Sequence, residues 1–123
     1  MILVDTSIWI DHLHRGEPAL EELLAQEQVA VHPLVIEELA LGSLSSREQV
    51  LSLLSRLRPV REVSHRELMM LVKAHSLFSR GLSVVDARLI GSVLITPGAQ
   101  LWTRDKRMRA ACSAVGGTVA PYE

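Results

Sequence analysis

The feature that most constrains the fold is the regular alternation of short apolar runs with longer segments of helical periodicity. Apolar runs typical of β-strands occupy residues 2–4, 29–31, 59–63, 101–103 and 118–120. The intervening segments predict helices over residues 7–14, 18–25, 33–41, 46–57, 64–81, 83–94 and 106–115. Strands that alternate with helices form parallel sheets covered on both faces. The sequence therefore predicts an α/β fold of three layers, α/β/α, with a central, mostly parallel sheet of four to five strands.

Length and composition predict one compact domain over residues 1–123. Hydrophobic residues make up 48% of the chain, and a chain of this length can bury a conventional core. No apolar run approaches the roughly 20 residues that span a bilayer, and the N-terminus does not resemble a secretory signal. The single cysteine, Cys112, fits a reducing compartment. We therefore expect a cytoplasmic protein with no membrane partner.

The charges are divided between the two halves of the chain. Residues 1–55 carry nine acidic and two basic residues, whereas residues 56–123 carry eleven basic and five acidic residues. This asymmetry is compatible with an acidic and a basic functional face, and equally with two solvated helical surfaces. The chain has only four aromatic residues, which argues against a base-stacking platform for RNA.

Acidic residues occur where a parallel sheet binds ligands. Asp5 and Asp105 directly follow two predicted strands, and ligands of open α/β sheets bind beyond the carboxyl ends of the strands. Asp86 lies in a mostly apolar helical segment, and the pair Glu37 and Glu38 lies in another. An unpaired carboxylate on an apolar face is costly. The pattern therefore predicts an acidic site, although periodicity does not choose between Glu37 and Glu38.

Helix capping is a local alternative for each of the aspartates. Asp5 and Asp105 precede predicted helices, and Asp86 completes a capping box with Ser83. Capping accounts for each residue separately. It does not account for acids placed after two different strands and on an apolar helix face of the same chain.

Four short motifs in order resemble PIN-domain proteins, and especially the VapC-type toxins of toxin–antitoxin pairs. The motifs are Asp5-Thr6-Ser7 followed by Trp9-Ile10-Asp11, Glu38-Leu39-Ala40-Leu41-Gly42, Ser83-Val84-Val85-Asp86-Ala87 with Ile90, and Thr103-Arg104-Asp105. The resemblance implies a PIN-like α/β/α domain. It also selects Glu38 over Glu37, because Gly42 stands four residues after Glu38. Many relatives carry another acid and an aromatic residue shortly after the last aspartate, where this chain has Arg107 and Met108; we therefore do not extend the acidic cluster beyond Asp105.

The resemblance implies that Asp5, Glu38, Asp86 and Asp105 converge. Two carboxylates about 4 Å apart at an effective dielectric near 20 repel each other by about 4 kcal/mol, so such a cluster needs protons or a cation. Ligands that are all oxygen suit Mg²⁺ or Mn²⁺. Zinc is disfavoured, because the chain has one cysteine and its closely spaced histidines lie two residues apart.

A divalent cation held by carboxylates can activate water for phosphodiester hydrolysis, and the resemblance implies an endoribonuclease. Asp5 and Asp86 are the expected metal ligands, and Glu38 and Asp105 complete the acidic site and orient the nucleophilic water. Two further groups are expected to assist. Hydroxyls that support the ligands are expected at Thr6, Ser7 and Thr103. Residues that neutralise substrate phosphates, or alternatively form a solvated basic helix, are Arg104, Lys106, Arg107 and Arg109.

The resemblance also implies partners. A toxin of this kind cleaves RNA to inhibit growth or translation, is held inactive by a cognate VapB-type antitoxin, and forms a homodimer. A groove rich in Leu and Ile between the N-terminal helices is the expected place for an antitoxin segment. The alternative is a non-catalytic PIN scaffold that binds RNA or a protein partner. Dinucleotide binding is disfavoured because the chain lacks Gly-x-Gly-x-x-Gly near its start.

Overall fold

A computed structural model describes all residues from 1 to 123 and contains five strands and seven helices. In chain order they are β1 (Ile2–Val4), α1 (Thr6–Arg15), α2 (Pro18–Ala25), β2 (Val29–Val31), α3 (Pro33–Leu41), α4 (Arg47–Ser55), β3 (Arg58–Pro59), α5 (His65–Ala74), α6 (Val84–Ile95), β4 (Gln100–Trp102), α7 (Lys106–Ala114) and β5 (Thr118–Val119). None of the helices has both the length and the apolar character that a membrane crossing requires.

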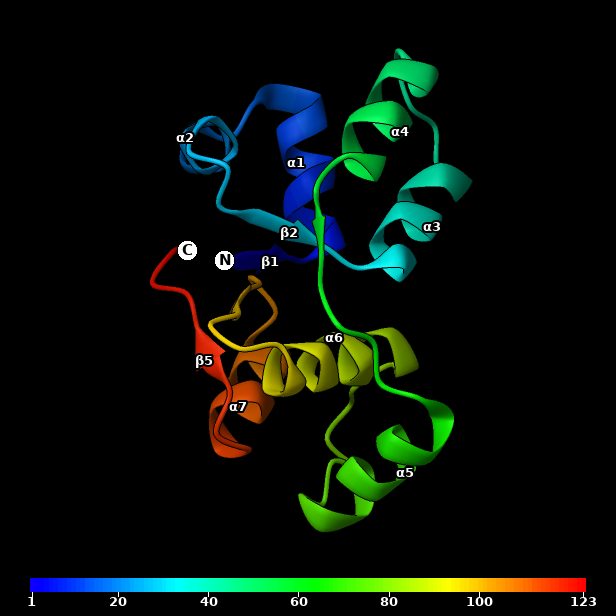
Figure 1. The fold of residues 1–123 in the computed structure, drawn as a ribbon, viewed down its shortest axis with the longest axis vertical. Helices are drawn as coiled ribbons and strands as arrows, with labels where there is room; N and C mark the ends of the chain where they lie inside the picture. Colours follow the sequence, from blue (N-terminus) through cyan, green and yellow to red (C-terminus); the bar gives the residue numbers. More distant parts are fainter.

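The five strands form one sheet in the order β3-β2-β1-β4-β5, and every neighbouring pair is parallel. Helices α1 to α4 lie on one side of the strands and α5 to α7 on the other (Figure 1). The predicted three-layer α/β/α fold is therefore confirmed, with all five strands parallel. The chain reverses its direction of travel across the sheet between β1 and β4, and this switch point is where open α/β sheets bind ligands.

The core is built from the central strands and the helix faces that cover them. Leu3 and Leu101 are fully buried on adjacent strands and are paired in register. Trp9 of α1 and Trp102 at the end of β4 are also fully buried. Both strands that lead to the switch point are thus anchored in the core, which fixes the position of the residues that follow them.

The helix predicted over residues 64–81 is shorter in the structure and ends at Ala74. Ser76 has a positive φ, its N–H donates to the Lys73 carbonyl, and the N–H of Leu77 donates to the Val72 carbonyl. These bonds form a Schellman motif, which ends a helix by reversing the chain. Leu77 then returns to the core, so burial of this leucine determines where the helix stops.

The first helix and the third strand also differ from prediction at their ends. Helix α1 begins at Thr6, one residue before the predicted start at residue 7, and Asp5 at the end of β1 is its cap, as the capping alternative for Asp5 predicts. The strand predicted over residues 59–63 is limited to Arg58–Pro59 at the sheet edge, where a proline that lacks an N–H is tolerated.

Fully buried His32 caps α3, the helix that carries Glu38. Its Nδ1 accepts a hydrogen bond from the Leu34 N–H (3.0 Å), and its Nε2 has no partner. Burial lowers the pKa of His32, as does Arg88, while Glu62 and Glu37 raise it. The neutral imidazole is therefore the form that suits the folded state.

This cap predicts a loss of stability in mild acid. As the pH falls below the ordinary histidine pKa of 6.5, the unfolded chain binds a proton before folded His32 does, so the free energy of unfolding falls. Urea unfolding measures the free energy of unfolding near pH 7 and near pH 5. Between these pH values it should fall less for His32→Asn than for the parent, because Asn keeps a capping oxygen but does not titrate. Equal falls in the two proteins would show that His32 makes no contribution.

Candidate active site

The candidate site lies at the switch point, where the ends of β1 and β4 are joined. The N–H of Asp5 donates to the Trp102 carbonyl (2.9 Å), which continues the pairing of the two strands into the first residue beyond β1. Thr103 follows Trp102 and is fully buried. The two strand ends therefore place the side chains of Asp5 and Thr103 next to each other.

Both carboxylate oxygens of Asp5 are held by protein donors. The N–H of Thr6 donates to Oδ1 (2.8 Å), and the hydroxyl of Thr103 donates to Oδ2 (2.8 Å). Burial raises the pKa of Asp5, the two hydrogen bonds lower it, and the nearby carboxylates of Asp86 and Glu38 raise it further. Asp5 is thus a capping residue and also the centre of a group of three acids.

Glu38 is tied to the same centre through a hydroxyl. The Thr6 hydroxyl donates to Oε1 of Glu38 (2.6 Å), while the N–H of Thr6 binds Asp5. Thr6 is buried, and α1 packs against α3. One threonine therefore ties Glu38 of α3 to Asp5, the residue that caps α1.

Asp86 serves as a cap and as a member of the acidic group. Its Oδ2 accepts from the Ser83 N–H (3.1 Å), and its own N–H donates to the Ser83 hydroxyl (3.0 Å). Its charge is close enough to raise the pKa of Asp5. The predicted capping box is present, and it holds Asp86 at the N-terminal end of α6 beside the end of β1.

Asp105 is joined to this group only indirectly. Its Oδ1 accepts from the N–H groups of Arg107 and Met108 (2.9 and 3.1 Å), and it thereby caps α7. Its N–H donates to the Thr103 hydroxyl (3.1 Å), the same hydroxyl that binds Asp5. Glu38 and Asp86 raise the pKa of Asp5, and Asp105 is not among its causes; the contact that joins Asp105 to Asp5 is the shared Thr103 hydroxyl.

Comparison with known proteins gives the family of this chain. The family model described as PIN domain matches residues 2–113, which include all four acids. The chain belongs to the PIN-domain family. This chain is also 52% identical over 120 residues to ribonuclease VapC32 of Mycobacterium tuberculosis, in the strains CDC 1551 / Oshkosh and ATCC 25618 / H37Rv. The match covers 98% of this chain and 97% of the relative. The resemblance to VapC-type PIN proteins is therefore confirmed along nearly the whole chain.

The donors of this PIN domain fit a hard divalent cation that keeps much of its water. The donor atoms are carboxylate oxygens, and neither Oε2 of Glu38 nor Oδ1 of Asp86 has a hydrogen-bond partner in the protein. None of the three ion pairs in the chain involves these acids. No group of three or more aspartate, glutamate, histidine or cysteine side chains is arranged to hold a metal ion, so a cation here would be held by one or two carboxylates together with water. Mg²⁺ and Mn²⁺ suit such a site, because Mg²⁺ is commonly held by one or two carboxylates together with water.

Ser7, the third hydroxyl residue predicted for the site, and the basic residues of α7 make contacts of different kinds. Ser7 is exposed and makes no hydrogen bond to the acids. Arg109 donates to the carbonyls of Thr103 and Tyr122 (3.4 and 3.1 Å). Arg107 packs over Gly81, where a Cβ added to the glycine would lie 2.6 Å from Nη1 of the arginine. Arg107 thus lies beside the loop that leads to Ser83 and α6, whereas Arg109 supports the turn after β4.

Arg104 is engaged by two acids that the sequence did not indicate as its partners. It donates to Asp11 and to Glu17. These ion pairs speak against a phosphate contact by Arg104, since both terminal nitrogens already bind carboxylates. The partners are 93 and 87 residues away along the chain, so no local sequence pattern indicates them.

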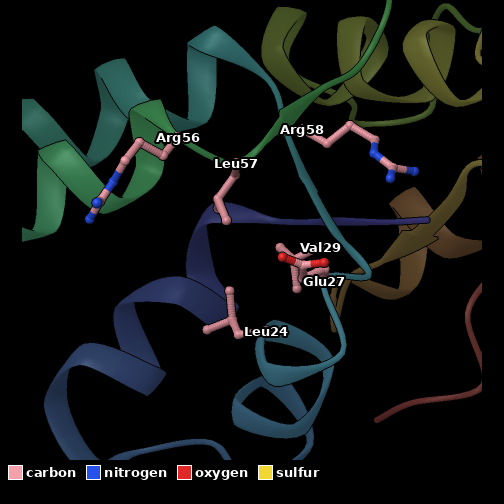
Figure 2. Close-up of a pocket in the computed structure, with 6 residues that line it drawn as sticks. All are labelled: Leu24, Glu27, Val29, Arg56, Leu57 and Arg58. Atoms are coloured by element: carbon pink, nitrogen blue, oxygen red, sulfur yellow. The ribbon is translucent and has the colours of Figure 1, made fainter.

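A separate hollow of about 390 Å³ lies at the amino ends of β2 and β3, the opposite edge of the sheet (Figure 2). Leu24, Val29 and Leu57 form its apolar part. The guanidinium groups of Arg56 and Arg58 point in opposite directions (Figure 2), so they do not converge on one anion. The candidate functional site therefore remains the one at the carboxyl edge.

Proposed function

We propose that this PIN-domain protein is a Mg²⁺- or Mn²⁺-dependent endoribonuclease and the toxin of a VapBC-type pair. The observation that carries the proposal is the group of Asp5, Glu38 and Asp86 at the switch point, with Asp5 and Glu38 both bound to Thr6. An isolated group of acids without a cationic partner is costly in a folded protein. The name of the M. tuberculosis relative, a ribonuclease, supports the same activity.

In this proposal Asp5 and Asp86 hold the metal. A bound Mg²⁺ or Mn²⁺ supplies a water of lowered pKa and neutralises charge on the scissile phosphate. The Thr103 hydroxyl and the Thr6 N–H each hold one oxygen of Asp5, so that the carboxylate cannot rotate. The Oε2 of Glu38, which has no partner in the protein, would orient the attacking water and accept its proton. The carboxylate of Asp105 completes the acidic site while its N–H holds the Thr103 hydroxyl, and Ser7 remains a candidate for binding water.

The substrate's phosphates are proposed to lie along the N-terminal part of α7. Lys106 and Arg109 line a shallow recess of this surface with Arg104 and Glu123, and Arg107 lies beside the loop before α6. Lys106 makes no ion pair, and it is the strongest candidate for a phosphate contact. Contacts of this kind give affinity without base specificity.

Partners and location form part of the proposal. A groove of about 240 Å³ between α1 and α3 is lined by Ile10, Leu13, Leu39 and Leu44, with Glu38 at its wall. It fits an apolar segment of a cognate VapB-type antitoxin, which would then lie against the acidic site. We also propose a homodimer and a cytoplasmic location, the latter supported by the free, buried thiol of Cys112.

Expression in a bacterial host tests the toxin assignment. The parent protein is expected to arrest growth, and co-expression of the product of the adjacent gene is expected to restore it. An Asp5→Asn protein made in equal amount controls for the burden of expression and should permit growth. Equal growth of the cultures that express parent and Asp5→Asn would contradict the assignment.

The position of Asp105 predicts a graded effect among the four acids. Asp105→Asn keeps an oxygen that can cap α7 and leaves the Asp5 group in place, so we expect kcat for RNA cleavage to fall only about 10-fold. Asp5→Asn should have a much larger effect. Steady-state cleavage of one RNA by the two purified variants compares them directly, and equal losses would place Asp105 on the metal itself.

A further inference from the structure

Arg104 joins the turn after β4 to the helical layer that covers the other side of the site. The residue lies between Thr103 and Asp105. Its Nη1 donates to Oδ2 of Asp11 and its Nη2 donates to Oε2 of Glu17, both at 2.7 Å. Asp11 lies within α1, and Glu17 is the residue that precedes α2. A single guanidinium therefore links three segments of the chain.

This cluster is less exposed and has shorter bonds than the neighbouring surface ion pair of Arg15. The side chains of Arg104, Asp11 and Glu17 are 31%, 33% and 19% exposed, and the guanidinium lies 5.9 Å from the ring centroid of buried Trp102. The hydrogen bond to Glu17 makes the largest contribution to the raised pKa of Arg104. By contrast, Arg15 pairs with the same Asp11 at 3.6 Å and is 71% exposed. Short, charge-assisted bonds of a planar guanidinium fix geometry as well as charge.

The cluster gives α1 a second attachment to the turn that carries Thr103. The first attachment is the hydrogen bond from the Thr103 hydroxyl to Asp5, at the start of α1. The second is the Arg104–Asp11 pair, further along the same helix. The backbone bond from Asp5 to Trp102 and the burial of Ile8 and Trp9 fix the start of α1, and the Arg104–Asp11 pair ties a later turn of the helix to the turn after β4. The cluster therefore limits movement of the turn that carries Thr103 relative to Asp5.

We propose that Arg104 is a positioning residue, which acts through Asp11 and Glu17 to keep the Thr103 hydroxyl on the Asp5 carboxylate. Its catalytic consequence rests on the proposed ribonuclease function, whereas its effect on the turn does not. Arg104 then contributes to the orientation of the metal ligand without touching RNA. Loss of a group that orients a metal ligand typically lowers activity or metal affinity 10- to 100-fold.

Three single-site variants and one double variant separate this role from a phosphate contact. Arg104→Gln and Asp11→Asn each remove one side of the link and are expected to lower kcat for RNA cleavage about 10-fold, with KM for RNA changed less than about twofold. The double variant should be no worse than Arg104→Gln alone, because the two residues act as a unit. The matched control is Arg15→Gln, which removes the longer, exposed partner of Asp11 and should leave kcat and KM unchanged.

Hydrogen exchange of the metal-free protein tests the geometry without any activity measurement. The Asp105 N–H donates to the Thr103 hydroxyl, so its exchange should become at least about 10-fold faster in Arg104→Gln and Asp11→Asn, while core amides such as that of Leu101 remain protected. If Arg104→Gln does not fold, Arg104→Lys takes its place; an ammonium does not reproduce the planar, two-carboxylate contact and should give an intermediate effect.

Three results would overturn the proposal. A higher KM for Arg104→Gln, with no change in Asp11→Asn, would make Arg104 a phosphate ligand. Faster exchange at Asp105 and at core amides alike would reduce the cluster to general stability. Unchanged exchange at Asp105 would remove the link itself. If no protein, parent included, cleaves RNA, the proposed function fails, and the exchange measurement still decides whether Arg104 positions the turn.

Discussion

RNA cleavage is expected to fall by at least about 1,000-fold in kcat when Asp5 is replaced by Asn, which corresponds to about 4 kcal/mol of transition-state stabilisation. Asp5 is the proposed metal ligand that both Thr6 and Thr103 hold in place, and a neutral amide is a much weaker ligand for Mg²⁺. Single-turnover cleavage of a defined RNA at saturating Mn²⁺ measures the loss. Cleavage by Asp5→Asn within about tenfold of the parent would contradict the proposed role.

The same substitution should stabilise the metal-free protein at neutral pH. Because the pKa of Asp5 is raised above its ordinary value, chiefly by burial, ionisation of this group opposes folding at pH values above that raised pKa. This destabilising effect decreases as the pH falls below the raised pKa of Asp5 and is lost below the ordinary value of 3.8. Asn keeps an oxygen that can accept from the Thr6 N–H. We therefore expect a higher Tm for Asp5→Asn than for the parent near pH 7 without metal, and a difference that shrinks in acid. A lower Tm for Asp5→Asn than for the parent near pH 7 would show that the carboxylate stabilises the folded state.

The second large effect is expected for Asp86→Asn, which separates the two roles of this residue. Asn keeps an oxygen that can accept from the Ser83 N–H, and the bond from residue 86 back to the Ser83 hydroxyl does not involve the substituted side chain. The helix cap should therefore persist, and Tm should change little. The charge beside Asp5 is lost, and kcat should fall about 100- to 1,000-fold. Thermal unfolding and cleavage by one preparation give both quantities.

Ser83→Ala provides the matched control. It removes the hydroxyl that caps the Asp86 N–H and leaves the carboxylate, so it should cost about 1 kcal/mol of stability while cleavage stays within a few-fold of the parent. The opposite pattern, in which Asp86→Asn loses stability and Ser83→Ala loses cleavage, would assign Asp86 to the helix alone.

The fold was largely predictable because its elements are defined by local patterns. The apolar runs at 2–4 and 29–31 and the helix over 18–25 occur in the structure with the same bounds. The helix expected to reach Gly81 stops at Ala74 because Leu77 turns back into the core. That burial depends on neighbours distant in the sequence, which periodicity does not report.

The site was predictable in its location and less so in its connections. The residues after β1 and β4 had to meet once these strands were neighbours, which brought Asp5 and Thr103 together. Asp105 follows the same strand, yet its side chain turns to cap α7. Its charge alone makes Arg104 a candidate for phosphate binding, whereas the structure pairs it with Asp11 and Glu17. Whether a charge is free or paired is decided by tertiary contacts, and the sequence pattern did not contain that information.

The most direct test is RNA cleavage by the purified, antitoxin-free protein after chelation, with Mn²⁺ or Mg²⁺ then restored in steps. We expect no cleavage in the chelator, a rate that rises with the ion and saturates, and no restoration for Asp5→Asn or Asp86→Asn at any concentration. Cleavage that persists in excess chelator, or that both variants perform as well as the parent, would contradict the metal-nuclease assignment. Binding of RNA without cleavage under all of these conditions would instead favour a PIN scaffold.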